Sequence, residues 1–280
     1  MKLRYGAELD LQDCNKGALL KGIAGLVYET AEGVLPFAYA TADGEPGFNA
    51  AMTGAYRGSE GMIPQGIEMT REGTRLLYFS EDEGLEAAVE IEFEAEGVFR
   101  QRVRIKNVGQ KTVELTMLSC FLPLFSYRAP LDQQDFELLY CTQTWYGEGQ
   151  WHVVRPEEVG LFDCGGPPPT ASFEIAGLSS QTTSRFFPHL MLRDKRRKRT
   201  FFCELEPTGS WMMNLGLRRN WWKEEGCLPL LSGSAEDRTL GFCHALRPGE
   251  SYTSADCLYG AAEGGPDQAL RAITRARRPV

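Results

Sequence analysis

Two glutamates in the second half of the chain have a spacing that sugar hydrolysis could use. Glu204 and Glu206 lie two residues apart in a strand-like run, so their carboxylates share one face at about 6.6 Å along the backbone. Hydrolysis of a glycosidic bond usually needs two carboxylates, one on each side of the bond. The pattern is also typical of a solvated strand face, and we expect that role here. Earlier in the chain, Asp132, Asp135 and Glu137 follow Pro130 in a predicted loop and are likewise expected to be solvated rather than catalytic.

Aromatic side chains gather in two polar stretches and favour binding over catalysis. Trp145, Tyr146 and Trp151 surround a glycine-rich turn, and Trp221 and Trp222 lie between charged residues. Flat aromatic rings stack on the apolar C–H faces of sugars, and exposed aromatic rings also mark protein interfaces. We predict that these residues bind carbohydrate. The alternative, in which they close the ends of a sandwich or face another domain, stays open.

The histidines and cysteines show no metal-ligand spacing. His152, His189 and His244 are far apart, and none of the eight cysteines forms a Cys-x-x-Cys pair. We therefore predict no metal and no other cofactor. A histidine acid with a glutamate base is the chemistry of an aldose 1-epimerase, but His189 lies in a strand-like run and is expected to be a core or interface histidine. The cysteines are expected to be free, buried thiols.

Composition and missing motifs exclude several classes of function. The 280 residues, 42% hydrophobic and 24% charged, can build a sizeable core. The net charge of -8 and the pI near 5.1 argue against nucleic-acid and membrane partners. No apolar run approaches the roughly 20 residues that span a bilayer, and the first residues lack the apolar core of a secretory signal, so we expect a cytoplasmic protein. Signatures of phosphate-binding loops, dinucleotide folds, serine hydrolases and zinc proteases are absent.

The elements that must position these residues are strands. Residues 89–94 alternate apolar side chains with glutamates, and residues 99–106 alternate them mainly with basic side chains. Turn residues at 107–111 separate this run from a third at 113–117. Strand-like runs of the same kind occur again at 200–205, 211–217, 238–246 and 251–253. We predict an all-β protein built as a large antiparallel sandwich.

Two segments between the later strands have a distinctive composition. The basic run Lys195–Arg199 lies between strand-like runs at 186–192 and 200–205 and predicts a solvated hairpin tip. The alternative is a patch for an acidic partner or a neighbouring subunit. Gly165–Pro169 predicts an extended crossover between sheets.

One helix is predicted, at the C-terminal end. It begins at Pro266 and carries Ala269, Leu270, Ile273 and Ala276 along one stripe. Arginines crowd its last turn, where cations suit the helix dipole. We interpret this helix as a connector to a further domain.

Four segments occur in an order that is known from one enzyme family. They are Arg102–Leu115, Gly177–Ser180 with Phe186–Leu192, Gly241–Phe242 with Leu246–Tyr252, and Gly264–Arg278. In that order they resemble the R-x-x-I-x-N meander, the G-x-S-S … N-P-F-x-x-L segment, the L-x-P-G-E-x-F/Y turn and the final helix of the N-terminal domain of glycoside hydrolase family 36, the bacterial α-galactosidases. The resemblance covers the chain from about Leu85 to Val280.

The resemblance implies a galactose-mutarotase-like β-supersandwich that precedes a catalytic (β/α)₈ barrel. Such a barrel takes about 250 residues, and none follow Val280. We therefore expect a supersandwich at 1–265 and a connector helix at 266–280 that leads toward the barrel. In this family the domain also helps to form oligomers, so the expected partners are its own barrel and other copies of the chain.

Two departures from the family pattern bear on substrate contact. The G-D-[FY]-R stretch is missing from 58–66, and the W-x-x-E motif is changed at 151–155. Both argue against a role at the edge of a sugar site. The expected function is a non-catalytic accessory and assembly domain of an α-galactosidase-like glycoside hydrolase. The alternatives are a stand-alone carbohydrate-binding module, with a saccharide as its partner, or an aldose-epimerase-like enzyme.

Overall fold

The computed structural model describes the chain in segments. These are residues 3–4, 8–9, 37–42, 62–69, 73–95, 97–122, 124–128, 131, 134–163, 171–178, 185–219, 225–234 and 241–278. The predicted crossover at 165–169, Asp132, and the Trp221–Trp222 pair lie outside these residues. The described part forms two antiparallel sheets and carries one α-helix, α5 (Pro266–Ala276).

The larger sheet has ten strands. In spatial order they are β11 (Gly147–Val154), β10 (Phe136–Thr144), β13 (Phe186–Asp194), β14 (Arg199–Glu206), β19 (Asp256–Glu263), β7 (Val98–Asn107), β6 (Leu85–Ala95), β5 (Gly73–Ser80) and β4 (Ile63–Met69), with β18 (Ser251–Thr253) also beside β7. A short 3₁₀-helix, η1 (Pro156–Val159), follows β11.

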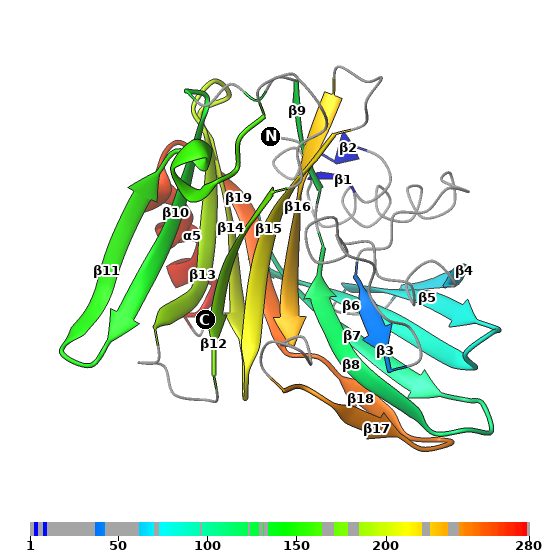
Figure 1. Cartoon of the computed structure of the whole chain (residues 1–280). Coiled ribbons are helices and arrows are strands. Elements are labelled where there is room, and N and C mark those ends of the chain that lie inside the picture. The colour runs from blue at the N-terminus through cyan, green and yellow to red at the C-terminus, as the bar shows by residue number, and fades with distance from the viewer. Residues whose placement is uncertain are drawn as a thin grey trace.

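The second sheet has nine strands and faces the first (Figure 1). Its main path is β12 (Ala171–Gly177), β15 (Trp211–Arg219), β16 (Glu225–Ser234), β9 (Leu124–Arg128), β1 (Leu3–Arg4) and β2 (Glu8–Leu9). Beside it, β8 (Val113–Phe121) pairs with β16, β17 (His244–Leu246) and β3 (Tyr39–Thr41). The predicted all-β antiparallel sandwich is confirmed.

The predicted alternation of inward and outward side chains is confirmed in β6 and β7. In β6 the inward-facing Val89 and Ile91 are buried, while the glutamates between and beyond them are partly exposed. In β7, Phe99, Val103 and Ile105 are buried. Since successive residues of a strand point to opposite faces, one face joins the core and the other stays polar.

Aromatic rings hold the two sheets together at the centre of the core. Phe121 of β8 stacks on Tyr259 of β19 with ring centroids 4.0 Å apart, and on Phe201 of β14 at 6.3 Å. All three rings are fully or almost fully buried. Removing this apolar surface from water is the main force that joins the sheets.

The cysteine prediction holds for most of the described thiols. Cys120, Cys203 and Cys257 are buried and free, and the Sγ atoms of Cys203 and Cys257 lie 3.2 Å apart. Burial raises the pKa of the Cys257 thiol well above its ordinary value. The prediction of a buried thiol is wrong for Cys243, which is exposed.

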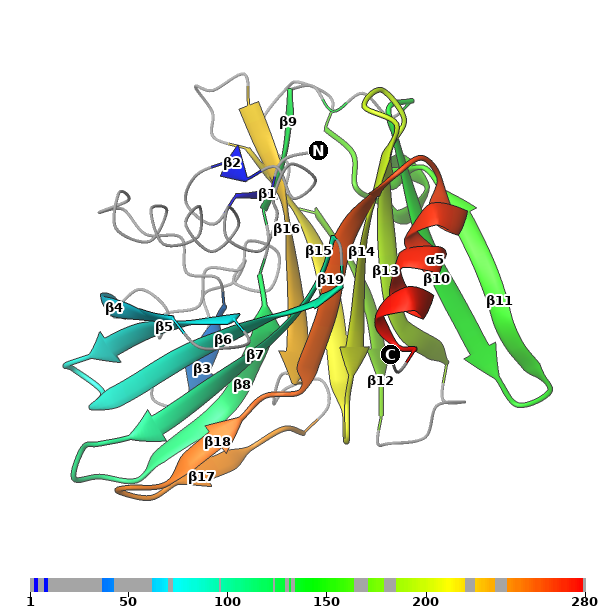
Figure 2. The same ribbon diagram turned by 180° about the vertical axis from the view of Figure 1, so that it is seen from behind.

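The predicted C-terminal helix is confirmed, and it lies on the outer face of the ten-stranded sheet (Figure 2). Ala269 and Ile273 are buried. They pack against Val98, Leu139, Met191, Phe202 and Leu258. Leu270 was expected on the same stripe but is 37% exposed, so the buried stripe is narrower than predicted. At eleven residues α5 is too short and too polar to cross a membrane, and the same holds for every helix in the described part.

The later hairpins follow the prediction with small differences. The basic run forms the β13–β14 turn, as expected, and Arg196 and Arg197 pair there with Asp135 and Asp194. Glu137 lies in β10 rather than in a loop. Of the strand expected at 238–246, residues 244–246 form β17, residues 241–243 are irregular, and the rest lies outside the described part.

Candidate functional site

The outer face of the ten-stranded sheet, turned away from the core, carries a row of charges. The strand register places one residue opposite the next across β4, β5, β6 and β7 and again across β19 and β14, and an ion pair of 3.7 Å joins the residues of β7 and β19. In that order they are Glu68, Arg75, Glu90, Arg102, Asp256 and Glu206, and we call them the charged row. Opposite charges that face each other stabilise a sheet, whereas like charges destabilise it. The Asp256–Glu206 end is therefore unfavourable unless a cation joins it.

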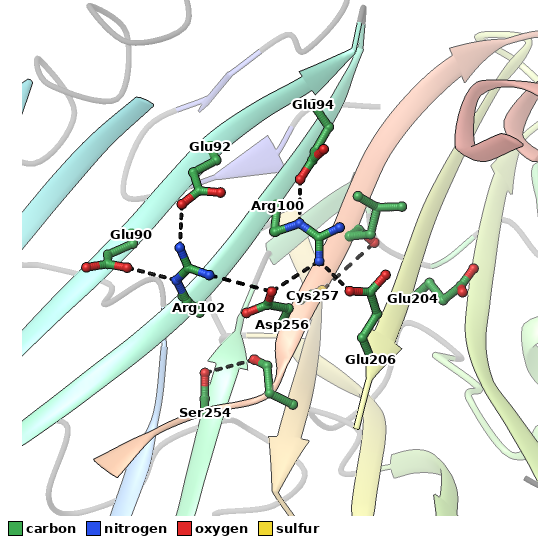
Figure 3. Close-up of polar contacts among 12 residues, drawn as sticks. Glu90, Glu92, Glu94, Arg100, Arg102, Glu204, Glu206, Ser254, Asp256 and Cys257 are labelled. Carbon is green, nitrogen blue, oxygen red and sulfur yellow. Dashed lines mark hydrogen bonds and ion pairs between the residues drawn. The ribbon is translucent and has the colours of Figure 1, made fainter. Parts of the chain in front are cut away.

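Arg100 of β7 supplies that cation (Figure 3). Its guanidinium contacts Glu94 and Glu206, and its Nη1 lies 3.1 Å from Oδ2 of Asp256. Burial disfavours the charged guanidinium, but these carboxylates outweigh burial and raise the pKa of Arg100 above its ordinary value. A permanent positive charge on β7 thus links this strand to β6, β14 and β19.

Arg102 and Arg75 hold Glu90 from both sides. Arg102 donates from Nε to Oε2 of Glu90 at 2.8 Å, and Arg75 donates from Nη2 to Oε1 at 2.8 Å. Burial raises the pKa of Glu90, but the two arginines lower it further than burial raises it. Glu90 is therefore ionised at neutral pH and cannot act there as a general acid.

Glu204 belongs to a second cluster at the end of α5. Its Oε2 lies 2.9 Å from Nδ1 of His189, and its Oε1 lies 2.6 Å from Nη2 of Arg277. The same Arg277 nitrogen lies 2.8 Å from Oε1 of Glu206. The two glutamates share one face, as predicted. The expectation of a solvated Glu204 is wrong, because its side chain is only 7% exposed.

The pKa of Glu204 reflects this environment. Burial raises it, but the contact with His189 and the charge of Arg277 outweigh burial, so the pKa lies below its ordinary value. Glu204 thus serves as an ionised anchor for Arg277.

His189, predicted to be a core or interface histidine, is buried beside Glu204 on the outer face of the ten-stranded sheet. Its side chain is 1% exposed, and its Nε2 has no hydrogen-bond partner in the structure. The Trp151 ring lies edge-on to the imidazole, with ring centroids 5.5 Å apart and an interplanar angle of 84°. The Phe187 ring stacks on the imidazole with ring centroids 6.4 Å apart. Aromatic rings therefore flank the buried imidazole.

The predicted carbohydrate-binding residues fall at two places on the β10–β11 hairpin. Trp145 and Tyr146 form its turn and are 74% and 91% exposed. Their ring centroids lie 5.6 Å apart at 77°, so the two rings do not form one flat platform. Trp151 lies further along β11 and is 42% exposed. Their role in sugar binding stays a prediction, and Trp221 and Trp222 lie outside the described residues.

The charged row is the feature that sequence reasoning missed. A signal was present, because glutamates at 90, 92 and 94 and arginines at 100, 102 and 104 flank one tight turn. A hairpin turn places such residues opposite one another. The contribution of Asp256 and Glu206, from distant strands, had no comparable local signal.

The outer face has a broad hollow, which Glu68, Arg75 and Glu90 of the charged row help to line. It measures about 660 Å³ and lies over β4, β5, β6 and β7. Leu77, Glu86 and Lys106 are among the residues that line it. In the described part no group of three histidine, cysteine or carboxylate side chains could hold a metal ion. The site is thus an ion-paired surface with a docked helix.

Comparison with known proteins gives a fold match without a sequence match. No protein-family model and no curated protein sequence matches the chain. The GH36 α-galactosidase AgaB from Geobacillus stearothermophilus is similar in structure, with a TM-score of 0.62 and 11% identity over 87% of this chain and 32% of that chain. The α-galactosidase from Lactobacillus brevis gives a TM-score of 0.61 and 11% identity over 87% of this chain and 31% of that chain.

A third solved structure agrees with these two. The galactosidase domain of the α-galactosidase–sucrose kinase AgaSK gives a TM-score of 0.59 and 13% identity over 77% of this chain and 29% of that chain. At such identities the match shows a shared fold. The resemblance predicted from the sequence is confirmed at that level, and the chain spans about a third of the length of the α-galactosidases it matches.

Proposed function

We propose that this chain is a non-catalytic accessory and assembly domain of an α-galactosidase-like glycoside hydrolase that acts on α-galactosides. The observation that carries the proposal is the match of 87% of this chain to 32% of an α-galactosidase. Sugar hydrolysis usually needs one carboxyl group that can donate a proton. On the outer face, Glu90 and Glu204 are instead held ionised by arginines. Catalysis then belongs to another domain, expected to be a (β/α)₈ barrel.

In this proposal α5 is the connector to that barrel. Its buried side chains fix it on the sheet, and Arg277 ties its end to Glu204 and Glu206. A helix fixed along its length and at its end gives the following chain a defined direction. The free thiols of Cys120, Cys203 and Cys257 support a reducing compartment such as the cytoplasm.

The test is hydrolysis of an aryl α-galactoside by the purified chain. We expect no release of the aryl group above the uncatalysed rate, while a complete α-galactosidase assayed in parallel is active. Turnover by this chain that disappears in Glu204→Gln would contradict the proposal. The reading frame downstream of Val280 is a second test, since it should continue for about the 250 residues of a barrel.

Sugar binding by the chain itself is a second candidate, favoured by the exposure of Trp145 and Tyr146 at the hairpin turn. Exposed rings next to polar residues can stack on a sugar face. Calorimetric titration with galactosides should then show binding that Trp145→Ala abolishes. Phe162→Ala, which removes another exposed ring, is the matched control. If calorimetric titrations with common saccharides show no heat of binding, this candidate function is excluded.

An epimerase-like activity is disfavoured by the position of its histidine and glutamate. His189 and Glu204 are in contact, but both side chains are buried, and Arg277 occupies the second carboxylate oxygen. An acid–base pair must reach the substrate by hydrogen bond. The mutarotation rate of galactose should therefore not change when the protein is added.

A further inference from the structure

We propose that β11 is a self-association edge, through which two copies of the chain pair strand to strand. This inference deepens the assembly part of the proposed function. It starts from the position of β11 at the end of the ten-stranded sheet. Five consecutive residues, 150–154, pair in unbroken register with β10, and among the described residues no strand pairs with the other side of β11.

An open edge exposes backbone N–H and C=O groups that can pair with another strand. Native sheets usually protect such edges with proline, lysine, bulges or short strands. β11 has eight residues and contains neither proline nor lysine. Its single acidic residue, Glu148, lies next to the turn, and residues 149–154 include no aspartate, glutamate, lysine or arginine.

The opposite edge of the same sheet is protected, which provides an internal comparison. Strand β4 contains Pro64, which has no N–H to donate. Its register with β5 also shifts between Pro64 and Gly66. The two edge strands of this sheet thus differ in how well they are protected against pairing with another strand. β11 is the edge strand that can still pair with a strand of another copy.

The side chains of β11 suit a second copy of the same strand. Trp151 and Val153 point to the outer face and are 42% and 58% exposed. A two-fold axis perpendicular to the sheet makes the two strands antiparallel and keeps outer residues opposite outer residues. With His152 opposite its own copy, each Trp151 lies opposite Val153 of the other copy. Apolar and aromatic pairs of this kind stabilise neighbouring strands.

Charge and exposed rings at the two ends of β11 agree with this arrangement. The antiparallel pairing places the two Glu148 side chains at opposite ends, so that they do not face each other. It also carries the exposed Trp145 and Tyr146 of each copy toward the end of β11 of the other. Phe162, just beyond η1, is 53% exposed and offers an apolar surface there. The pairing therefore covers exposed apolar groups at the turn, in the strand and after it.

The test is sedimentation velocity of the chain over a range of micromolar concentrations. We expect a concentration-dependent dimer in the wild type. Val153→Lys introduces a positive charge at the paired edge, which should leave a monomer at every concentration. Val153 is largely exposed, so this variant should fold, and its thermal unfolding should match that of the wild type.

Ile63→Lys is the matched control. Ile63 is 60% exposed and lies on the protected edge strand β4. The charge change is identical, so this variant should dimerise like the wild type. Higher ionic strength should tighten the dimer, because each copy carries a net charge of -8 and the copies repel each other.

Amide hydrogen exchange gives a second readout. Residues 148–154 should exchange more slowly as the protein concentration rises, whereas β4 should not change. A monomeric wild type, or a dimer that Val153→Lys leaves intact, would overturn the proposal. Galactoside turnover is a separate measurement, so failure of this proposal is distinguishable from failure of the proposed function.

Discussion

Nη2 of Arg277, at the end of α5, lies 2.6 Å from Oε1 of Glu204 in the ten-stranded sheet. The same nitrogen lies 2.8 Å from Glu206. This contact fixes the end of the helix to a strand that is about 70 residues earlier in the chain. The buried Glu204 carboxylate therefore depends on Arg277, at the end of the helix, for part of the positive charge that balances its own.

Arg277→Gln should destabilise the fold. Among the described residues the substitution leaves Glu204 with His189 as its remaining partner, and a hydrogen bond to a charged group contributes about 1.5–3 kcal/mol. The free energy of unfolding, measured in urea, should fall by that amount. Arg278→Gln is the matched control, because Arg278 is exposed and its substitution should change stability by less than about 0.5 kcal/mol. Equal effects of the two substitutions would show that the Arg277 contact does not stabilise the helix.

Glu204 should make stability depend on acidity. Its folded-state pKa lies below the ordinary 4.5, so the unfolded chain takes up this proton first as the pH falls. The stabilisation is complete above the ordinary pKa and is lost as the pH falls below it. Glu204→Gln should be less stable at pH 7 and should lose less stability on acidification.

Denaturation curves between neutral and acidic pH measure this effect. Glu90 also has a lowered pKa, so part of the acid sensitivity should persist in Glu204→Gln. Glu86→Gln, at an exposed position on the same face as Glu90, should follow the wild-type pH dependence. A wild-type pH profile in Glu204→Gln would mean that this carboxyl group is not stabilised by folding.

Arg100→Gln should weaken the junction between β7, β19 and β14. Without the guanidinium, Glu94, Glu206 and Asp256 remain close together with a deficit of positive charge. We expect a loss of about 2–3 kcal/mol in the free energy of unfolding. Added salt should restore part of it, since it screens the repulsion between partly exposed carboxylates.

Arg104→Gln is the control for this substitution. Arg104 lies on the same face of β7, and its guanidinium donates to Ser251 Oγ at 3.0 Å. Among the described residues no carboxylate pairs with Arg104, so the loss of stability should be small and insensitive to salt. A larger effect at Arg104 than at Arg100 would contradict the role given to Arg100.

Gly260→Ala should disrupt the sheet at β19. A Cβ at this position would lie 2.0 Å from the Gly97 carbonyl oxygen and 2.7 Å from the Phe202 ring. The backbone of the neighbouring turn cannot yield that much, so we expect a loss of about 3 kcal/mol or more. Gly209→Ala is the control, because no heavy atom lies within 4 Å of the added Cβ. Thermal unfolding of the two variants measures the difference.

Much of the local structure could be predicted from the sequence. The alternation around Val89 and Phe99 assigned the inward faces of β6 and β7, because a strand exposes successive residues on opposite sides. The run from Pro266 identified α5, since the capping and apolar pattern of a helix is also local. The basic run Lys195–Arg199 identified a hairpin tip for the same reason.

The candidate site depended on the tertiary structure. Arg100 and Glu206 are 106 residues apart in the chain, and they meet because β19 lies between β7 and β14. Glu204 looked solvated in the sequence, because a strand pattern does not show that a later helix will end above it. Strand alternation and helix periodicity are local properties of the backbone, so the sequence by itself determined them. The neighbours of each strand and the open edge at β11 were decided by contacts between distant residues, which form only when the sheets assemble.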